Sequence, residues 1–341
     1  MPKINVLIAG STGYIGVELV KILINHKNVN IKYLCGNSSI GKKISVFDKF
    51  LSKKKLPKII KFNKKLLLDV DVVFTALPNG ESQKISKYLL KKNVLIDLSA
   101  DFRLRNKNDF FKWYKIKHKA PNMIKKSIYA LPEIKKNKIK KNKIISCPGC
   151  YPTSILLPLI PLLKKNLIFN DNIIIDSKSG YSGAGRGVHK KYKNKNLYES
   201  ISTYGIPIHR HNSEIQQELD LISHKKNIFQ FTPHLTPMFR GILTTIYVDL
   251  KHDITAKEIN ATLKNFFKND IFVKIAKLNT LLSTNDVINT NNCIISVCKS
   301  NYKNKLIILS VIDNLIKGGS GQAVQNMNKI YNFKENEGLN V

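Results

Sequence analysis

The glycine-rich stretch AGSTGYIG, near the start of the chain, constrains the fold more than any other feature. Its three glycines follow an apolar run at 3–9 and precede a run at 14–25 whose apolar residues recur at helical spacing. A strand, a glycine turn and a helix in this order are typical of dinucleotide-binding domains, where the helix N-terminus faces the pyrophosphate. A tight turn without a ligand is the alternative. The predicted cofactor-binding residues of the turn are Gly10, Ser11, Thr12, Gly13, Tyr14, Ile15 and Gly16.

Strand-like and helical patterns alternate through the first 150 residues. The expected strands after the first are 31–35, 71–77, 93–101 and 143–146, with a helix at about 81–91. This alternation predicts a Rossmann-type, doubly wound parallel sheet in an α/β fold.

The residue pattern of the sequence changes after a helix expected at roughly 153–165. Strand-like runs then dominate, at 172–176, 241–250, 293–298 and 306–313, before a closing helix in GGSGQAVQNMNKIYNF. We expect a second, α+β domain built on a mostly antiparallel sheet.

The length and the charge of the chain limit which classes of function are possible. A chain of 341 residues is long enough for about two domains. No apolar run approaches the ~20 residues of a membrane span, and the start lacks the order of a signal peptide, so we expect a cytoplasmic protein without a membrane partner.

The net charge of +34 comes from lysines spread along the whole chain with Asn and Ile. Because the basic stretches lack interleaved aromatic residues, we predict no nucleic-acid partner.

The end of the second expected strand discriminates between cofactors. NAD-preferring sites place an Asp or Glu there to hold the ribose diol. Here the sequence reads YLCGNSSIGKK, without an acid. Asn37, Ser38, Ser39 and the lysines at 42 and 43 could hold a 2′-phosphate instead, which favours NADP(H).

The stretch CPGCYPTSILL contains two of the five cysteines. Cys150 follows a strand and a Pro-Gly turn and precedes a helix that Pro152 and Thr153 can begin, and a helix N-terminus stabilises a thiolate. We therefore interpret Cys150 as a nucleophile and Cys147 as a packed core thiol.

Two other readings of the C-x-x-C pattern are a redox pair and half of a zinc site completed by Cys293 and Cys298. An odd spacing on a strand puts the latter two on opposite faces, which argues against zinc. We predict no metal.

Eight stretches, in order along the chain, carry a resemblance to one enzyme family. They are GSTGYIGVELVKIL, DLSADFRL, YALPEI, CPGCYPTSILL, SGYSGAGRG, HRHNSEI, FTPHLTPMFRGILTT and DNLIKGGSGQAVQNMN. Together they resemble the N-acetyl-γ-glutamyl-phosphate reductases of arginine biosynthesis, which are grouped with aspartate-semialdehyde and glyceraldehyde-3-phosphate dehydrogenases. The resemblance runs from residue 4 to about 330.

The resemblance implies NADPH-dependent reductive dephosphorylation of a small acyl phosphate, N-acetyl-L-glutamyl 5-phosphate, to a semialdehyde. It implies a thioester on Cys150 and an acid–base partner in the HRH motif, for which we choose His209, with His211 as the alternative. The family more often has Thr-Pro-Glu where this chain has NSEI, which loosens the placement of Glu214. A homo-oligomer, either dimer or tetramer, is also implied.

Arginine is scarce, at positions 103, 105, 186, 210 and 240. Since bidentate binding of carboxylate or phosphate requires arginine where a bare charge does not, we assign substrate binding to Arg103, Arg210, Arg186 and Arg240, and a structural role to Arg105. The further implied cofactor-binding residues are Ser38, Ser39, Pro78, Ser182, Gly183 and Asn314.

The expected domains are 1–148 with 314–341, which bind NADP, and 149–313, which hold the catalytic and oligomerisation surfaces. A sister reductase acting on an aminoadipyl phosphate remains open, because one methylene is worth only ~1–3 kcal/mol in a pocket. Aspartate-semialdehyde dehydrogenase is disfavoured, since it lacks the paired CPGCYPT and HRHNSEI motifs. A decayed enzyme that binds nucleotide or RNA is the alternative from another class.

Overall fold

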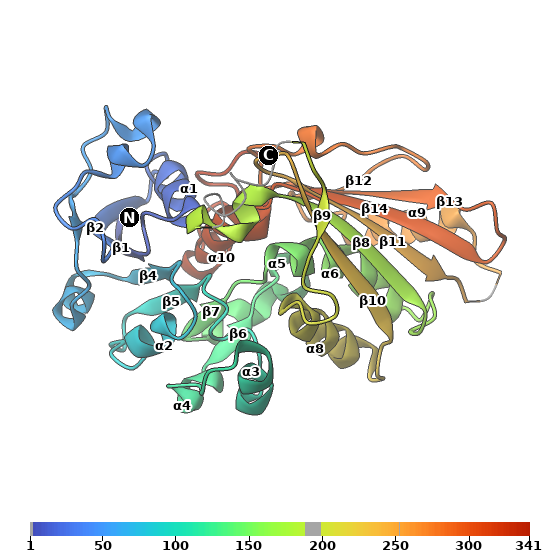
Figure 1. Ribbon diagram of the computed structural model, residues 1–341, viewed down its shortest axis with the longest axis horizontal. Helices are drawn as coiled ribbons and strands as arrows, with labels where there is room; N and C mark the ends of the chain where they lie inside the picture. Colours follow the sequence, from blue (N-terminus) through green and yellow to red (C-terminus); the bar gives the residue numbers. More distant parts are fainter. Residues whose placement is uncertain (1–2, 188–198, 252) are drawn as a thin grey trace. The chain divides into compact units, whose positions relative to one another are not determined.

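The structure, a computed structural model, describes residues 3–187, 199–251 and 253–341 (Figure 1). The chain divides into two compact units. Unit 1 comprises Met1–Pro148 and Gly319–Asn340, and unit 2 comprises Gly149–Gly318, together with Val341. The chain thus leaves unit 1 between Pro148 and Gly149 and returns to it after Gly318, five residues later than the sequence analysis expects for the second boundary.

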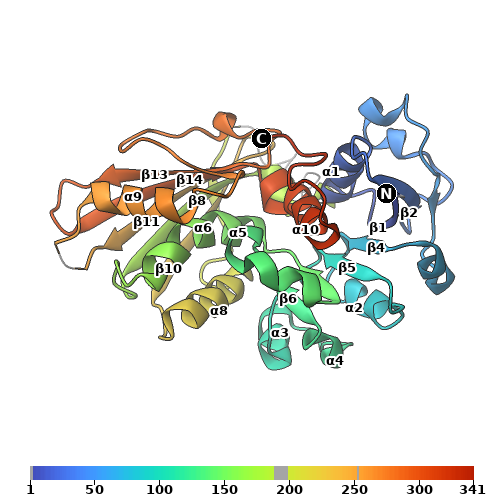
Figure 2. The ribbon, with the colours of Figure 1, turned by 180° about the vertical axis from the view of Figure 1, so that it is seen from behind.

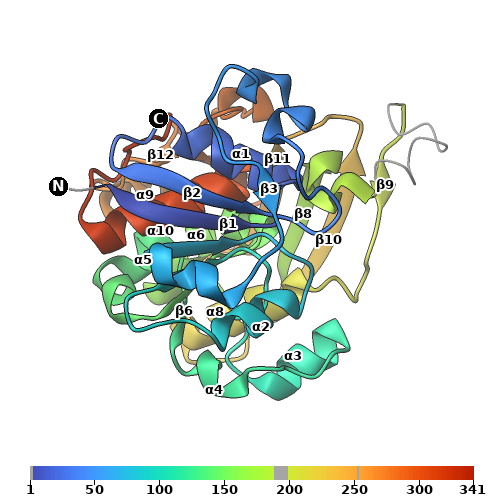
Figure 3. The same cartoon turned by 90° about the vertical axis from the view of Figure 1, so that its left-hand side faces the viewer.

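The sheet of unit 1 is parallel. Within the described residues it has seven strands in the order β3-β2-β1-β4-β5-β7-β6, and each pairing is parallel. The strands are β1 (Ile4–Ala9), β2 (Val29–Cys35), β3 (Ile59–Ile60), β4 (Val72–Thr75), β5 (Val94–Asp97), β6 (Ser127–Tyr129) and β7 (Ile144–Ser146). Figure 3 shows β1 and β2 side by side in dark blue. The order turns back at β1, so the expected doubly wound parallel sheet is confirmed.

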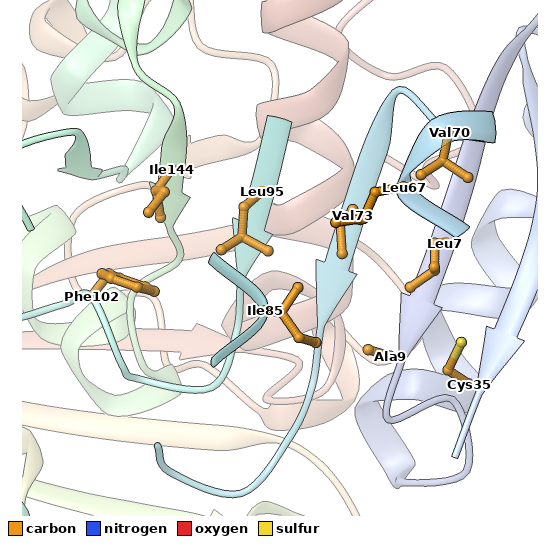
Figure 4. Packing of buried hydrophobic residues seen from close by; sticks show 10 residues of the cluster. All are labelled: Leu7, Ala9, Cys35, Leu67, Val70, Val73, Ile85, Leu95, Phe102 and Ile144. Atoms are coloured by element: carbon orange, nitrogen blue, oxygen red, sulfur yellow. The ribbon is translucent and has the colours of Figure 1, made fainter. Parts of the chain in front are cut away.

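Strands β1, β4, β5 and β7 are buried on both faces over most of their length, as their continuous apolar runs require. On one face Leu7, Val73 and Leu95, from three adjacent strands, pack with Ile85 of α2 (Glu81–Ser86) and with Phe102 (Figure 4). On the other, α10 (Gly321–Tyr331) contacts α1 (Tyr14–Leu23) and β5. The C-terminal segment is therefore part of the core of the N-terminal unit.

Short elements complete unit 1. They are α3 (Lys107–Tyr114), α4 (Pro121–Ile124), α5 (Pro132–Lys135) and the 3₁₀ helices η1 (Ile44–Val46), η2 (Lys49–Leu51), η3 (Lys64–Asp69) and η4 (Lys136–Lys141). Helix α2 ends at Ser86 rather than at about residue 91. Buried Asn93 explains the early end, because its side chain accepts from Leu90 N (2.8 Å) and donates to the carbonyl of Val70 (2.7 Å), which fixes a non-helical connection.

The sheet of unit 2 is mixed. Within the described residues its seven strands run β12-β13-β14-β11-β8-β10-β9, parallel only at β12–β13 and β8–β10. The strands are β8 (Ile173–Gly180), β9 (Ser202–Thr203), β10 (Phe229–Thr236), β11 (Ile242–Asp249), β12 (Val273–Ile275), β13 (Cys293–Lys299) and β14 (Lys305–Ile312). The expected mostly antiparallel sheet is confirmed.

Three helices of unit 2 belong to one layer against this sheet. Helix α6 (Cys150–Lys164) contacts β11, β14, α8 (His211–Ser223) and α9 (Ala256–Phe266). Helix α9 contacts β12 and β13, and Figure 2 shows it beside β13. Buried and more exposed residues alternate along β8 and β11, where the neighbours Ile174 and Tyr247 are 44% and 42% exposed. The sheet thus buries one face and exposes apolar side chains on the other.

In the part of the chain that the structure describes, unit 2 also contains short turns of helix. They are the 3₁₀ helices η5 (Tyr181–Ala184) and η6 (Thr284–Asp286), and a π-helical turn, η7 (Ile316–Ser320), which runs into unit 1. Among the described residues, no helix combines the length and apolar character needed to cross a membrane.

Candidate active site

The glycine turn of unit 1 joins β1 to α1, and its glycines differ in what they do. Gly10 has a φ of +85°, and a Cβ there would lie 2.1 Å from the carbonyl oxygen of Ala76. A Cβ on Gly16 would lie 2.2 Å from the oxygen of Gly10. The fold itself therefore requires these two glycines. Gly13 is different, because a Cβ there would lie 3.7 Å from the carbonyl oxygen of Gly10, an ordinary contact distance.

The turn is fixed to the end of β2. The amides of Gly10 and Ser11 both donate to the carbonyl of Cys35, at 3.0 and 3.2 Å, and the Ser11 hydroxyl donates to it at 3.2 Å. Thr12, Tyr14 and Ile15 are half-buried at the start of the ten-residue helix α1. A rigid turn, a glycine with room for an approaching group and the N-terminus of a helix fit a dinucleotide pyrophosphate.

The other predicted cofactor residues of unit 1 follow β2 and β4. After β2 the chain reads Gly-Asn-Ser-Ser, with Ser38 exposed and Ser39 buried, and Pro78 is exposed before α2. The carboxylate of buried Asp101 accepts from the amides of Gly80 (2.7 Å) and Gln83 (3.1 Å) at the start of α2. Burial, followed by the charge of Asp97, raises the pKa of Asp101 to about 7.

Cys147 lies in unit 1, directly after β7, and is buried. Burial is the largest cause that raises the pKa of its thiol to about 12, and the charge of Asp97 adds to it. The side chain of Asn326 donates to the sulfur at 3.8 Å. A thiol in this environment is protonated at neutral pH.

Arg103 is buried next to it. Its Nε donates to the carbonyl of Cys147 (2.8 Å), and its Nη2 donates to the carbonyl of Leu98 (3.2 Å). The guanidinium of Arg103 therefore holds two backbone segments of unit 1 together.

Cys150 is the first residue of α6 and belongs to unit 2. The helix starts here, two residues earlier than Pro152, which still lies in its first turn, where a missing amide hydrogen costs nothing. Gly149 is the N-cap, and Cys150 is half-buried. A side chain at this position lies at the positive end of a 15-residue helix, which favours a thiolate.

His211 and Glu214, both from the first turn of α8, converge on Gly149. The buried Glu214 carboxylate accepts from the amide of Gly149 at 3.0 Å, and its other oxygen lies 3.8 Å from His211 Nε2. A Cβ built on Gly149 would lie 2.4 Å from the same nitrogen. The imidazole of His211 therefore lies directly against the residue before Cys150.

His209 lies in an aromatic cage. Its ring centroid is 5.6 Å from that of Tyr151, 5.3 Å from Tyr204 and 5.5 Å from Phe231. Its Nδ1 accepts from the amide of His211 at 3.2 Å. Burial, followed by the charge of Arg210, lowers the pKa of His209 to about 4, so the ring is neutral at pH 7.

The glycine-rich loop 180–187 and the segment after β14 meet in unit 2. The side chain of Asn314 donates to the Ser182 hydroxyl (2.9 Å) and accepts from the amide of Gly241 (2.7 Å). Gly183 lies beside this pair, since a Cβ on it would be 3.5 Å from Asn314 Nδ2. The structure therefore brings these three predicted cofactor residues together.

The other predicted arginines of unit 2 have different surroundings. Arg240 Nη1 donates to Asn289 Oδ1 (2.8 Å) and to the buried Asp313 carboxylate (3.2 Å). Arg186 and Arg210 are exposed. Asp313 was not predicted from the sequence, where its only signal is its place at the start of DNLIKGG.

Comparisons with known proteins bear on both units. Residues 5–142 match a model for the semialdehyde dehydrogenase NAD binding domain, and residues 150–314 match one for the semialdehyde dehydrogenase dimerisation domain. The N-acetyl-gamma-glutamyl-phosphate reductase of Clostridium botulinum (strain Eklund 17B / Type B) is 43% identical over 340 residues, covering 99% of this chain and 98% of that protein. The chain belongs to the N-acetyl-gamma-glutamyl-phosphate reductase family.

The family extends beyond bacteria. The probable N-acetyl-gamma-glutamyl-phosphate reductase, chloroplastic, of Arabidopsis thaliana is 41% identical over 98% of this chain and 84% of that protein. The resemblance found in the sequence is thus confirmed, as is the expected dinucleotide-binding domain.

Solved structures agree on the fold. Aspartate semialdehyde dehydrogenase II complexed with ASA from Vibrio cholerae has a TM-score of 0.70 at 16% identity, covering 97% of this chain and 99% of that one. Aspartate semialdehyde dehydrogenase with NADP from Candida albicans has a TM-score of 0.68 at 15% identity, covering 97% and 98%. At these identities the likeness supports the semialdehyde dehydrogenase fold alone.

Proposed function

We propose that this protein catalyses the NADPH-dependent reduction of N-acetyl-L-glutamyl 5-phosphate to N-acetyl-L-glutamate 5-semialdehyde, with release of phosphate, in arginine biosynthesis. The relatives carry the name of this activity over nearly the full chain. The single structural observation that supports the chemistry is the placement of Cys150 at the start of α6, with His211 and Glu214 against Gly149.

Cys150 is the nucleophile in this proposal. Its thiolate attacks the acyl carbon, the bond from carbon to the phosphate oxygen breaks, and inorganic phosphate leaves with the electron pair. A thioester remains on the sulfur. The amides at the start of α6 favour the thiolate, and covalent catalysis replaces one difficult step by two easier ones.

Reduction follows on the same carbon. Bound NADP(H) supplies the hydride that reduces the thioester carbonyl. The resulting oxyanion takes a proton to give a thiohemiacetal, and a base then removes that proton as the carbon–sulfur bond breaks and Cys150 leaves as thiolate. A single imidazole near the sulfur can serve as acid in one direction and base in the other.

We assign that imidazole to His211 rather than to His209. The ring of His211 touches Gly149, and the buried carboxylate of Glu214 lies 3.8 Å from its Nε2, where it can orient the ring. His209 packs among aromatic rings, and its lowered pKa leaves the ring unprotonated at neutral pH and a weak base. This choice takes the alternative that the sequence left open.

The chain's cofactor preference in this proposal is for the phosphorylated dinucleotide. The residues after β2 are Asn37, Ser38 and Ser39, without an acid to hold an unphosphorylated ribose, and lysines follow at 42 and 43. Hydroxyls, an amide and lysines match a 2′-phosphate.

The substrate's phosphate and carboxylate need cationic partners. Arg210, at the N-cap of α8 and next to the two histidines, is our first choice, with exposed Arg186 second. Arg103 and Arg240 are weaker candidates, because each donates hydrogen bonds to acceptors of the protein itself.

We also propose a cytoplasmic homo-oligomer that binds neither nucleic acid nor membrane. The domain match for unit 2 carries the name dimerisation domain, and the exposed apolar face at Ile174 and Tyr247 is a suitable surface for a second copy. Dimer and tetramer both remain open.

The test is a reverse assay with N-acetylglutamate semialdehyde, phosphate and NADP⁺. We expect turnover that requires phosphate and is several-fold faster with NADP⁺ than with NAD⁺ at equal concentration. The aminoadipyl semialdehyde, one methylene longer, provides the second arm. Faster turnover of the longer substrate would reassign the substrate, and absence of turnover with both would refute the proposed activity.

A further inference from the structure

The turn that follows β14 touches the nucleophile. A Cβ built on Gly318 would lie 2.6 Å from the Cβ of Cys150 and 3.0 Å from its Cα. The φ of Gly318 lies outside the left-handed region, so glycine is required here by space and not by backbone conformation. The backbone of residue 318 therefore occupies the position that a neighbouring side chain would otherwise take beside Cys150.

One buried carboxylate fixes the start of this turn. Oδ1 of Asp313 accepts from the amides of Leu315 (2.9 Å) and Ile316 (3.2 Å). Oδ2 accepts from the amide of Asn289 (2.9 Å) and from Nη1 of Arg240 (3.2 Å). The Asp313 carboxylate is fully buried and thus has four donors, which is the condition for a stable buried charge.

Two more contacts fix the end of the turn. The amide of Gly318 donates to the carbonyl of Asp313 at 2.9 Å. The Lys317 side chain is fully buried, with its ammonium 5.5 Å from the ring centroid of Phe272. The segment also enters the π-helical turn η7, a geometry that is frequent at functional sites.

We propose that Asp313 and Gly318 are positioning residues for the nucleophile. Asp313 holds the turn 313–318 in place, and the turn presses the backbone of Gly318 against Cα and Cβ of Cys150. This contact limits how the thiol can be displaced and holds it at the N-terminus of α6. The inference rests on the proposed role of Cys150 and extends it to residues more than 160 positions away in the sequence.

The direct test is Gly318→Ala, with Lys257→Ala, an exposed position in the first turn of α9, as the control. The added methyl cannot fit at 318 without displacing either residue 318 or Cys150. We expect kcat to fall by about 10²-fold in Gly318→Ala, the cost of displacing a reacting group by roughly 1 Å. KM should change by less than about threefold, and Lys257→Ala should retain wild-type kcat.

A second readout follows the thiol without substrate. The rate at which iodoacetamide alkylates Cys150, measured across pH by mass spectrometry, should fall in Gly318→Ala, with its midpoint shifted to higher pH, while the thermal unfolding curve stays cooperative. A role in folding alone would lower the melting temperature but leave the alkylation profile unchanged.

Asp313 provides the variant pair if Gly318→Ala does not fold. Asp313→Asn keeps an oxygen for the two turn amides, and Asp313→Ala keeps none. We expect the alkylation midpoint to shift less in the first than in the second. Wild-type kcat and alkylation in folded Gly318→Ala would overturn the inference. An active Cys150→Ser enzyme would instead overturn the proposed function, so the two failures are distinguishable.

Discussion

The end of β7 and the start of α6 each carry a cysteine, and the two differ in almost every property that governs a thiol. Cys147 is 1% exposed, and burial raises its pKa to about 12. Cys150, three residues later, is half-buried at the N-terminus of a long helix, beside the Gly149 amide that Glu214 holds. Reactivity is thus decided by access and by the local field rather than by residue type.

The strongest test of this difference between the two cysteines is to replace Cys150. We predict that Cys150→Ser lowers kcat by roughly 10⁴-fold or more, the scale of losing a nucleophile, because an alkoxide is far harder to form than a thiolate. The melting temperature should stay close to wild type, since the side chains are similar in size. The reverse assay and a thermal unfolding scan measure both. If Cys147→Ser instead showed this loss of kcat, the nucleophile would be Cys147.

The two histidines sharpen the comparison next. Replacing His211 by Asn should reduce kcat by about 10²- to 10³-fold, the usual range for a general acid–base group. The same change at His209 should cost about tenfold or less, since its ring contributes packing around Tyr151 and Tyr204. Steady-state kinetics of both variants decide the assignment, and a larger loss at His209 would restore the original prediction.

Cys147 should respond to substitution mainly through stability. For Cys147→Ser we expect kcat within about threefold of wild type and a loss of about 1–2 kcal/mol in the free energy of unfolding, because a hydroxyl is costlier to bury than a thiol. Urea unfolding with activity measured in parallel checks this. Iodoacetamide should label Cys147 only after unfolding.

The smallest expected effects concern how the free energy of unfolding depends on pH. The pKa of His209 is lowered to about 4 in the folded protein, so the unfolded chain binds an extra proton below its ordinary value of 6.5. Stability from this group is therefore present above pH 6.5 and is lost as pH falls toward 4. The variant His209→Asn should flatten the slope of unfolding free energy against pH in that window. An unchanged slope would contradict the lowered pKa.

The thiol of Cys147 predicts the opposite direction. Its folded pKa of about 12 lies above the ordinary value of 9.0, so its contribution is present below pH 9 and is lost as pH rises toward 12. A comparison of wild type with Cys147→Ser in alkaline unfolding experiments isolates this group. Equal alkaline slopes for the two proteins would count against burial as the cause.

Local patterns predicted much of the fold. The glycine turn and the alternating runs of unit 1 predicted strands β1, β2, β4, β5 and β7, because buried parallel strands are apolar along their length. The short strands β3 and β6 were missed. Strand β10 was also missed, and it contains Pro233, which has no amide hydrogen to donate to a neighbouring strand. The order of the motifs predicted Cys150 as the nucleophile, and this role stays a prediction.

The rest of the site depends on contacts between distant residues. Glu214 meets Gly149 across 65 positions, and Gly318 meets Cys150 across a longer separation, so neither contact has a local pattern. The sequence also could not separate His209 from His211, because both occur in one tripeptide and only the packing distinguishes them.

Unit 1 is formed by both ends of the chain, and this affects how the protein folds during its synthesis. Helix α10 supplies Asn326, which donates to the carbonyl of Ala130 at 3.1 Å, and Asn328, whose side chain hydrogen-bonds to His26 at 2.8 Å. During translation the first 148 residues leave the ribosome long before this helix exists. The nascent N-terminal half therefore has an uncovered sheet face while the second unit is synthesised, and its core is completed only when residues 319–340 emerge.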